Sequence, residues 1–320
     1  MTRKLILDVD TGIDDALAIA YALGSEELEL IGITGTYGNV LVPTGTRNAL
    51  AILELFGRTD IPVFAGPDHA RAKDSFEVLE ISEFIHGING IGEAVIPDAK
   101  RQVEETSAVD FMVESVREHG DDLVIVPVGP LTTVAAAMEA DEHFAANAHI
   151  VNMGGALTVP GNVSPWAEAN INQDPEAADM VFRGVGDITM IGLDVTLQTL
   201  LTTEETAKWE ALGTVGGDFL AAATNYYIKA YETTAPYLGG CGLHDPLAVG
   251  VAVDPTLVTT IDINMKTDTE GATRGRTIGD ETRLNDPVKT AHVAVGVDVQ
   301  RFLAEFMRRL TDLAAATPAR

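Results

Sequence analysis

Cysteine and basic residues are the scarcest features of this 320-residue sequence. Its one cysteine, Cys241, excludes an internal disulfide and a metal cluster built from several thiolates. Lysine and arginine together number 21 against 48 aspartates and glutamates, a formal net charge of -27. Nucleic acids and anionic membranes attract positively charged surfaces, so neither is an expected partner. Such acidity suits either a high-salt cytoplasm or an ordinary acidic enzyme, and composition does not choose between them.

Long apolar runs, linkers and internal repeats are also absent. No uncharged stretch approaches the roughly 20 residues that a membrane-spanning helix needs. The N-terminus reaches a carboxylate at Asp8, too early for the apolar core of a signal peptide, so a cytoplasmic location is expected. No Pro/Ser-rich segment divides the sequence, and we expect residues 1–320 to form a single domain.

Short apolar, β-branched segments alternate with helical patterns along the first 200 residues. This alternation is typical of an α/β fold with an open, mainly parallel sheet flanked by helices. The continuous apolar run at 123–126 indicates a central strand buried on both faces. Strands are expected at 4–7, 28–34, 61–64, 123–128, 149–153 and 188–193, and helices at 14–23, 44–56, 107–118, 131–140 and 175–182.

Beyond residue 200 the pattern becomes mainly helical. Extra C-terminal helices are expected at 204–212, 215–231 and 299–313, with a small hairpin at 269–283 before the last of them. Two earlier stretches, 65–106 and 154–173, show no regular periodicity. Functional loops are expected there.

Aspartates gather where the first expected strand ends, at Asp8, Asp10, Asp14 and Asp15. Ligands of an open α/β sheet bind outside the carboxyl ends of its strands, so this is a suitable place for a site. Asp14 and Asp15 could instead favour the start of the next helix, but that role does not explain Asp10. Carboxylates that converge without a nearby Lys or Arg repel one another, and a hard cation such as calcium or magnesium removes the conflict.

A strand that ends in Asp-x-Asp also resembles the motif of phosphatases in which the first aspartate is the nucleophile. Those enzymes carry Thr or Val two positions beyond the second aspartate, where this sequence has Gly12. They also lack the adjacent pair Asp14-Asp15. The phosphatase interpretation is therefore disfavoured.

Further polar and glycine-containing motifs are spread along the chain. They are Asp8-Val-Asp-Thr-Gly-Ile-Asp-Asp-Ala16, Gly35-Thr-Tyr-Gly-Asn39, Met153-Gly-Gly, Gly161-Asn162, Ala167-Glu168-Ala-Asn170, His244-Asp245-Pro-Leu-Ala and Thr273-Arg-Gly-Arg-Thr277. Each alone is a weak signal. Together, and in this order over residues 4–290, they resemble the inosine–uridine-preferring nucleoside hydrolase family.

The resemblance implies calcium-dependent hydrolysis of the N-glycosidic bond of ribonucleosides to ribose and free base. It implies that Ca²⁺ is bound by Asp10, Asp15, Asp245 and the backbone carbonyl of Val128, with Asp8 supporting the cluster. Asp10 would also be the general base toward a metal-activated water. The resemblance further implies a homodimer or homotetramer. Substrate-binding residues would be Asp14, Asn39, Met153, Asn162, Glu168 and Asn170.

This chemistry is also reasonable without the family name. Cleavage of an N-glycoside passes through an oxocarbenium-like state, so the site must supply a nucleophilic water and a partner for the leaving base. A cation lowers the pKa of bound water, and a carboxylate within hydrogen-bond reach completes the deprotonation. Direct attack by water predicts inversion at the anomeric carbon.

The leaving base requires an acid, and His244 is the catalytic candidate because the ordinary pKa of histidine lies near neutrality. The alternative is that His244 only packs before a helix that Asp245 caps, since Asp-Pro recurs in this chain. His86, on a Gly-rich segment, is either a substrate-binding residue or part of a surface loop. Tyr227 and Tyr231 share one helix face and either line the base pocket or pack in the core. Trp166 and Cys241 receive no role.

A second class of function is a metal-dependent nucleoside-binding protein without turnover. Retention of Asp10 argues against it, because binding alone needs no general base. The sequence does not determine the preferred base; Ala169 replaces an aromatic residue that a relative could carry between Glu168 and Asn170.

Overall fold

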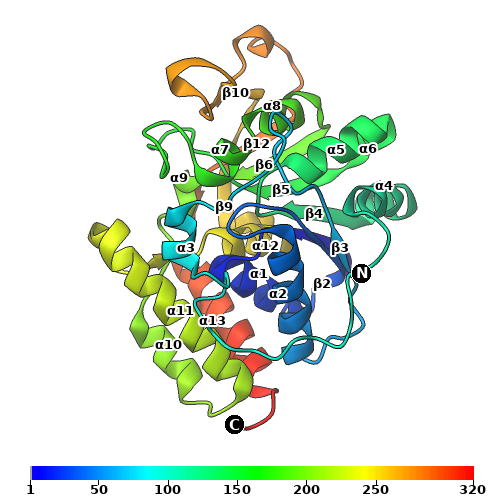
Figure 1. The fold of residues 1–320 in the computed structure, drawn as a ribbon. Coiled ribbons are helices and arrows are strands. Elements are labelled where there is room, and N and C mark those ends of the chain that lie inside the picture. The colour runs from blue at the N-terminus through cyan, green and yellow to red at the C-terminus, as the bar shows by residue number, and fades with distance from the viewer. Residues whose placement is uncertain (1) are drawn as a thin grey trace.

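The computed structural model describes residues 2–320, which are arranged around an eight-stranded sheet (Figure 1). The strand order is β3-β2-β1-β4-β5-β6-β12-β9. All neighbours are parallel except β9, which pairs antiparallel with β12. The strands are β1 (Arg3–Val9), β2 (Leu28–Gly35), β3 (Val63–Ala65), β4 (Leu123–Pro127), β5 (His149–Met153), β6 (Asp187–Ile191), β9 (Val258–Ile263) and β12 (Ala291–Val297).

Helices cover both faces of this sheet, as Figure 1 shows. The first face carries α1 (Ile13–Leu23), α2 (Val42–Leu55), α12 (His244–Val253) and α13 (Val299–Ala315), with α10 (Thr203–Glu210) and α11 (Val215–Thr234) packed outside them. The second face carries α4 (Ala108–His119), α5 (Thr132–Ala140), α6 (Glu142–Asn147) and α8 (Pro175–Gly184). Shorter helices are α3 (Glu80–His86), α7 (Ala169–Gln173) and α9 (Leu193–Thr196).

Strand β1 shows why the sheet needs two helical layers. Its side chains alternate between the faces: Leu5 and Leu7 belong to the first core, and Ile6 belongs to the second. All three are fully buried. A strand that is buried on both faces has a continuous apolar sequence. The apolar run at 123–126 lies in β4, which is likewise buried along its length. The predicted fold class, a mainly parallel α/β sheet flanked by helices, is confirmed.

The strand order reverses at β1, and this places the site. Strands β2 and β3 follow on one side of β1, and β4, β5 and β6 follow on the other. Loops leave such a switch point in opposite directions, which opens a crevice at the carboxyl ends of the strands. Because β1 ends at Val9, Asp10 lies at the mouth of that crevice.

Several predicted boundaries were wrong. The strand expected at 61–64 is β3 at Val63–Ala65. The hairpin expected at 269–283 consists of β10 (Met265–Thr267) and β11 (Thr277–Gly279), so its first strand begins earlier. The stretches expected to be irregular contain α3 and the whole of α7. A further pair, β7 (Leu200–Leu201) with β8 (Cys241–Gly242), was not predicted, nor were β9 and β12.

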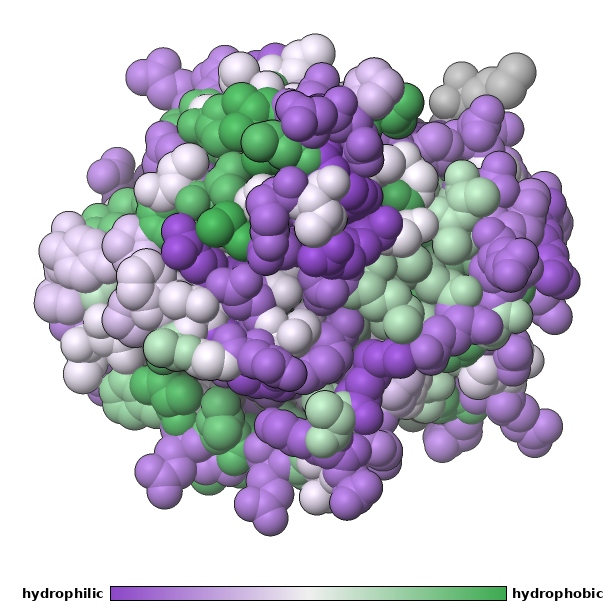
Figure 2. Space-filling view, turned by 90° about the horizontal axis from the view of Figure 1, so that it is seen from above, coloured by the Kyte–Doolittle hydropathy of each residue, from purple (hydrophilic) through white to green (hydrophobic). Residues whose placement is uncertain are grey.

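The molecular surface is mixed in character. On the face shown in Figure 2, hydrophobic residues gather in separate patches bounded by hydrophilic ones. Ile81 and Phe84 of α3 are among the large apolar side chains that remain exposed. Within residues 2–320, no helix combines the length and apolar character needed to cross a bilayer.

Candidate active site

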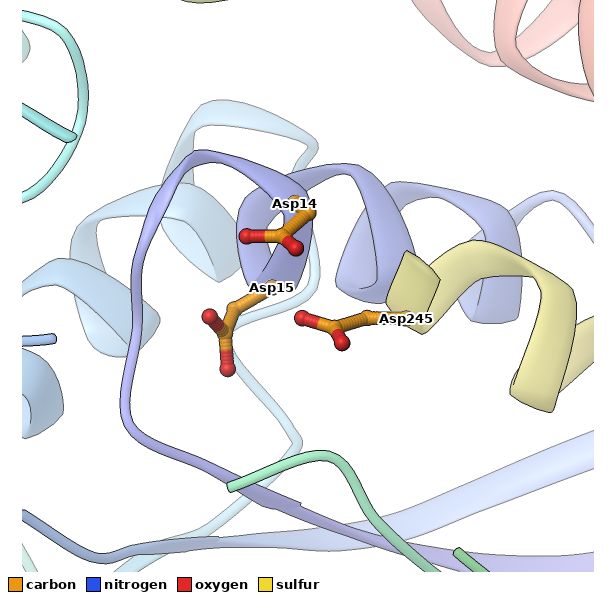
Figure 3. Close-up of side chains that lie close together, drawn as sticks. All are labelled: Asp14, Asp15 and Asp245. Carbon is orange, nitrogen blue, oxygen red and sulfur yellow. The ribbon is translucent and has the colours of Figure 1, made fainter. Parts of the chain in front are cut away.

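Three carboxylates meet beside the end of β1. Asp14 and Asp15, from the first turn of α1, face Asp245, from the first turn of α12 (Figure 3). One oxygen from each lies within 4.8 Å of the others, a spacing suited to a shared metal ion. Asp10 is not part of this close set. It lies alongside, because its backbone N–H donates to Asp15 Oδ1 at 3.1 Å.

Asp15 has a local structural role as well. Its Oδ2 accepts a 2.7 Å hydrogen bond from the N–H of Gly12, the residue that precedes α1. The helix-start interpretation is therefore correct for Asp15, and both of its oxygens are fixed in place. For Asp245 the structure contradicts the capping alternative. Leu243 occupies the N-cap of α12, and no side chain caps that helix.

Glycines allow the backbone to approach the carboxylates closely. A Cβ atom at Gly38 would lie 2.0 Å from Asp10 Oδ2, so a larger residue there would displace the carboxylate. The next residue, Asn39, donates its N–H to the same oxygen at 2.7 Å. A Cβ atom at Gly12 would similarly collide with His86 and Asn39. The glycines of the first two motifs thus bring Asn39 and His86 against the aspartates.

Burial places the aspartates under electrostatic strain. Desolvation, and then repulsion from Asp15, raise the pKa of Asp14 from 3.8 to about 8. The same two causes raise the pKa of Asp10 well above its ordinary value. Desolvation and the charge of Asp14 do the same to the pKa of Asp245. Among residues 2–320, no Lys or Arg forms an ion pair with these groups.

Asp8 lies behind the cluster at the centre of the sheet. It is aligned with Thr34 on β2 and Pro127 on β4, and it accepts a 2.6 Å hydrogen bond from the Thr34 hydroxyl. Burial raises the pKa of Asp8 to about 7. Its position matches that of a carboxylate supporting the cluster.

The residues present fit a hard divalent cation. Their donors are oxygens, which calcium and magnesium prefer. Asp10 Oδ1 and Asp14 Oδ1 are buried without a hydrogen-bond partner in the described part of the chain. Buried carboxylate oxygens are normally paired, so both oxygens are available to a bound cation or to water. A metal ion would also remove the repulsion that raises the pKa values.

The second wall of the site is the segment from β5 to α7. Glu168 caps α7: its Oε1 accepts the Asn170 N–H at 2.9 Å, and its Oε2 accepts the Gly155 N–H at 2.9 Å. Asn162 Oδ1 accepts the N–H of Ala169 at 3.0 Å. These bonds fold residues 154–170 into a closed loop, here called the sugar loop, that faces the aspartates.

Asn170 joins the sugar loop to the sheet. Its amide Nδ2 donates to the carbonyl of Val128 at 2.7 Å and to that of Met153 at 3.3 Å. The Val128 carbonyl follows β4 and has a second lone pair that could reach a metal ion. Val128, Met153 and Asn170 are therefore adjacent, as the motifs predicted.

His86 comes from the end of α3 and is held as a neutral ring. Its Nδ1 accepts the backbone N–H of Ile13 at 3.1 Å, so the single proton of the neutral ring lies on Nε2. Burial, and then the charge of His244, lower the pKa of His86 to about 3. The 3.8 Å approach of Nδ1 to Asp14 is consequently not an ion pair. His86 lies in the site and not on a surface loop.

His244 and the two tyrosines form a hydrogen-bonded group on the opposite wall. His244 Nε2 lies 2.7 Å from the Tyr231 hydroxyl, and its Nδ1 lies 2.8 Å from the hydroxyl of Thr196. Tyr227 donates to Asp14 Oδ2 at 3.2 Å. Burial lowers the pKa of His244 to about 4, so the free protein carries it as a neutral ring at pH 7. Both tyrosines line the cavity, and both also pack against the hydrophobic core.

These groups meet at one cavity of about 590 Å³. Asp15 lies just behind its wall, next to Asp14. The sequence-predicted residues that line it are Asp10, Asp14, Asn39, His86, Val128, Met153, Asn162, Glu168, Asn170, Tyr227, Tyr231, His244 and Asp245. No predicted site residue lies elsewhere in the fold.

Sequence reasoning missed the apolar part of the cavity. Ile81 and Ile85 of α3 line it on one side, and Tyr237 and Leu238 beyond α11 line it on another. Thr196, the partner of His244 Nδ1, was also missed. These residues lie in no recognisable motif, and the acidic composition of 80–86 conceals a helix with two apolar side chains facing the cavity.

Comparison with known proteins agrees with this geometry. The family model for inosine-uridine preferring nucleoside hydrolase matches residues 5–304. The chain belongs to that family and is a nucleoside hydrolase.

Individual relatives match along almost their whole length. The chain is 38% identical to probable uridine nucleosidase 2 of Arabidopsis thaliana, over 97% of this chain and 98% of that protein. It is 35% identical to the pyrimidine-specific ribonucleoside hydrolase RihA of Shigella boydii, over 97% and 99%. A solved structure, the purine-preferring ribonucleoside hydrolase from Gardnerella vaginalis, has a TM-score of 0.97 and 65% identity, over 98% of this chain and 99% of that one.

The raised pKa values predict a pH-dependent response to calcium. A carboxyl group whose pKa rises on folding stabilises the metal-free fold below its unfolded pKa, and that stabilisation is lost as pH rises toward the folded pKa, about 8 for Asp14. A divalent cation would bind the deprotonated groups. We therefore expect calcium, compared with chelator, to raise the melting temperature more at about pH 8.5 than at about pH 5.5. Differential scanning calorimetry measures this shift.

A matched control is Asp60→Asn, since Asp60 is an exposed aspartate paired with Arg58 away from the site. This variant should keep the calcium response, and Asp245→Asn should lose it. Equal calcium shifts at the two pH values would contradict the interpretation.

Proposed function

We propose that this enzyme hydrolyses the N-glycosidic bond of ribonucleosides with the help of Ca²⁺ held by Asp10, Asp15, Asp245 and the carbonyl of Val128. The main support for the proposal is that two kinds of group line the same cavity. Unpaired, buried carboxylate oxygens face a loop whose amide and carboxylate groups suit a sugar diol. We also propose that residues 1–320 act as one catalytic domain.

Asp10 is the proposed general base. A bound divalent cation lowers the pKa of water and orients a diol. Asp10 Oδ2 is fixed by the Asn39 N–H, whereas Oδ1 is buried and free to take a proton. Asp10 also lines the cavity, where a carboxylate within hydrogen-bond reach of a cation-bound water could take its proton.

The ribose is proposed to lie between the aspartates and the sugar loop. Asp14 and Asn39 approach it from one side, and Asn162, Glu168 and Asn170 from the other. A carboxylate accepts from a hydroxyl, and an amide can donate to one or accept from it. This mixture would orient both hydroxyls of a diol and fix the anomeric carbon relative to Asp10.

The leaving base is proposed to lie on the apolar side of the cavity, between α3 and the end of α11. His244 would act there as the acid, with Tyr231 in contact with its Nε2. His244 is neutral in the free protein at pH 7, contrary to the expectation of a pKa near neutrality, so it must first take up a proton from solvent to act as an acid. Negative charge developing on the base would favour that uptake by raising the pKa of the ring. His86, through Nε2–H, and Tyr227 complete the proposed base pocket.

For the preferred base we propose purines. The relatives differ in the preference that their names state: uridine, pyrimidines or purines. The purine-preferring relative shares 65% of its residues with this chain, well above the other two. A homodimer or homotetramer and a cytoplasmic location remain predictions made from the sequence and the family.

A nucleoside panel tests the activity. Inosine, adenosine, uridine and cytidine are incubated with the protein and calcium, and released ribose is measured as reducing sugar. Asp10→Asn should fold and lose at least about a thousandfold in kcat, because it removes the proposed base without changing the shape of the side chain.

Asp60→Asn is again the matched control and should turn over like the wild type. Ribose release by Asp10→Asn at the wild-type rate would show that Asp10 is not the base. Tight nucleoside binding by the wild type without ribose release would favour the binding-protein interpretation.

The acid role of His244 has a separate test. His244→Gln should lower kcat for inosine about a hundredfold, and it should leave hydrolysis of p-nitrophenyl riboside within a few-fold of wild type, because nitrophenolate leaves without protonation. The release of nitrophenolate and of ribose is followed for both substrates. Equal losses on the two would contradict an acid role and indicate that His244 only shapes the cavity.

A further inference from the structure

The motif Thr273–Thr277 has no part in the proposed chemistry, yet it lies against the sugar loop. It forms the end of the β10–β11 hairpin, with Thr277 as the first residue of β11. No residue of this motif lines the cavity. Its contacts instead reach residues of the sugar loop that do not line the cavity.

Thr277 binds the sugar loop at the backbone of a single residue, Ala156. Its hydroxyl accepts the N–H of Ala156 at 2.9 Å and donates to the carbonyl of the same residue at 3.1 Å. The side chain is 1% exposed, so water does not compete for these bonds. Ala156 is thereby held in place by a side chain more than 100 residues away in the sequence.

Gly275 and Arg276 contact the other end of the same loop. Gly275 has φ +85°, and a Cβ atom there would lie 2.8 Å from the Cβ of Ala167. The guanidinium of Arg276 lies over the ring of Trp166, 5.2 Å from its centroid. A cation over an indole face is an attractive contact, and it gives Trp166 a partner despite its exposure.

Arg274 fixes the hairpin itself. Its guanidinium forms a two-pronged ion pair with Glu176 in the first turn of α8, with the shorter contact at 2.6 Å. The planar guanidinium matches both carboxylate oxygens at once, which restricts orientation as well as distance. The hairpin is therefore tied to a rigid helix on one side and to the sugar loop on the other.

The two contact points border the hydrogen bond that closes the sugar loop. Glu168 Oε2 accepts the N–H of Gly155. Gly155 directly precedes Ala156, which Thr277 holds, and Glu168 directly follows Ala167, which packs on Gly275. The hairpin thus restrains Ala156 and Ala167, the neighbours in sequence of the two residues that form this hydrogen bond. A loop that carries hydroxyl-binding groups works only when those groups are held in place before the substrate arrives.

We propose that Thr277 and Arg276 are positioning residues, which hold the sugar loop in the shape that binds the ribose hydroxyls without touching the substrate. This inference rests on the proposed function. It assigns the hairpin, Trp166 and the motif Thr273–Thr277 a shared role in selecting ribose. Their loss should weaken recognition of the sugar more than it weakens the fold or the metal site.

The test compares Thr277→Val with Thr277→Ser on inosine and 2′-deoxyinosine. Valine has the shape of threonine but cannot make either bond to Ala156, whereas serine keeps the hydroxyl. We expect Thr277→Val to raise KM for inosine about tenfold, which corresponds to about one hydrogen bond. The loss should be smaller for 2′-deoxyinosine, which already lacks one hydroxyl, and Thr277→Ser should restore most of the affinity.

Thr260→Val is the matched control, since Thr260 is an exposed threonine on β9, the edge strand of the large sheet, and makes the same change of side chain away from the sugar loop. It should keep wild-type KM, and all variants should keep the calcium-induced rise in melting temperature. An unchanged KM in Thr277→Val, or equal losses on the two substrates, would overturn the inference. Absence of sugar release by the wild type would instead overturn the proposed function, and this inference with it.

Discussion

The burial of like charges at the end of β1 is the constraint on which the rest of the structure depends. Three buried carboxylates from α1 and α12 lie within 4.8 Å of one another, with Asp10 beside them. Such a cluster is unfavourable by itself, because each charge is desolvated and repelled by the others. The fold stabilises it only in part, through the backbone N–H groups that reach Asp15 and Asp10. A divalent cation bound there would supply the remaining compensation and would give the cluster a role in the chemistry.

The sheet explains how residues so distant in sequence come to share one cavity. Its order reverses at β1, and the loops after β1, β2, β4 and β5 meet at the same edge. The aspartates occupy the floor of the cavity, the sugar loop forms one wall, and α3 with the end of α11 forms the apolar side. The division between a polar floor and an apolar side corresponds to the two halves of a nucleoside, its sugar and its base.

The sequence predicted much of this because the relevant signals are local. Short apolar, β-branched runs and helical patterns predicted β1, β2, β4 and most long helices. The predicted site residues line the cavity, except Asp15, which lies next to it. Strand β9 was missed because most of its side chains are exposed, and α3 because its acidic composition conceals the apolar face. The pairing of His244 with Thr196, and of Thr277 with Ala156, depends on tertiary contacts across 48 and 121 residues that no local pattern encodes.

Isothermal titration of the metal-free protein with calcium, in two buffers that differ in ionisation enthalpy, measures both the stoichiometry and the protons released. Burial and mutual repulsion raise the pKa of these carboxyl groups, that of Asp14 to about 8, so calcium binding is expected to release protons near neutral pH. We expect one calcium ion per chain, with proton release that decreases as the pH rises above about 8. Absence of binding, or binding without proton release at about pH 6.5, would contradict a metal site built from these aspartates.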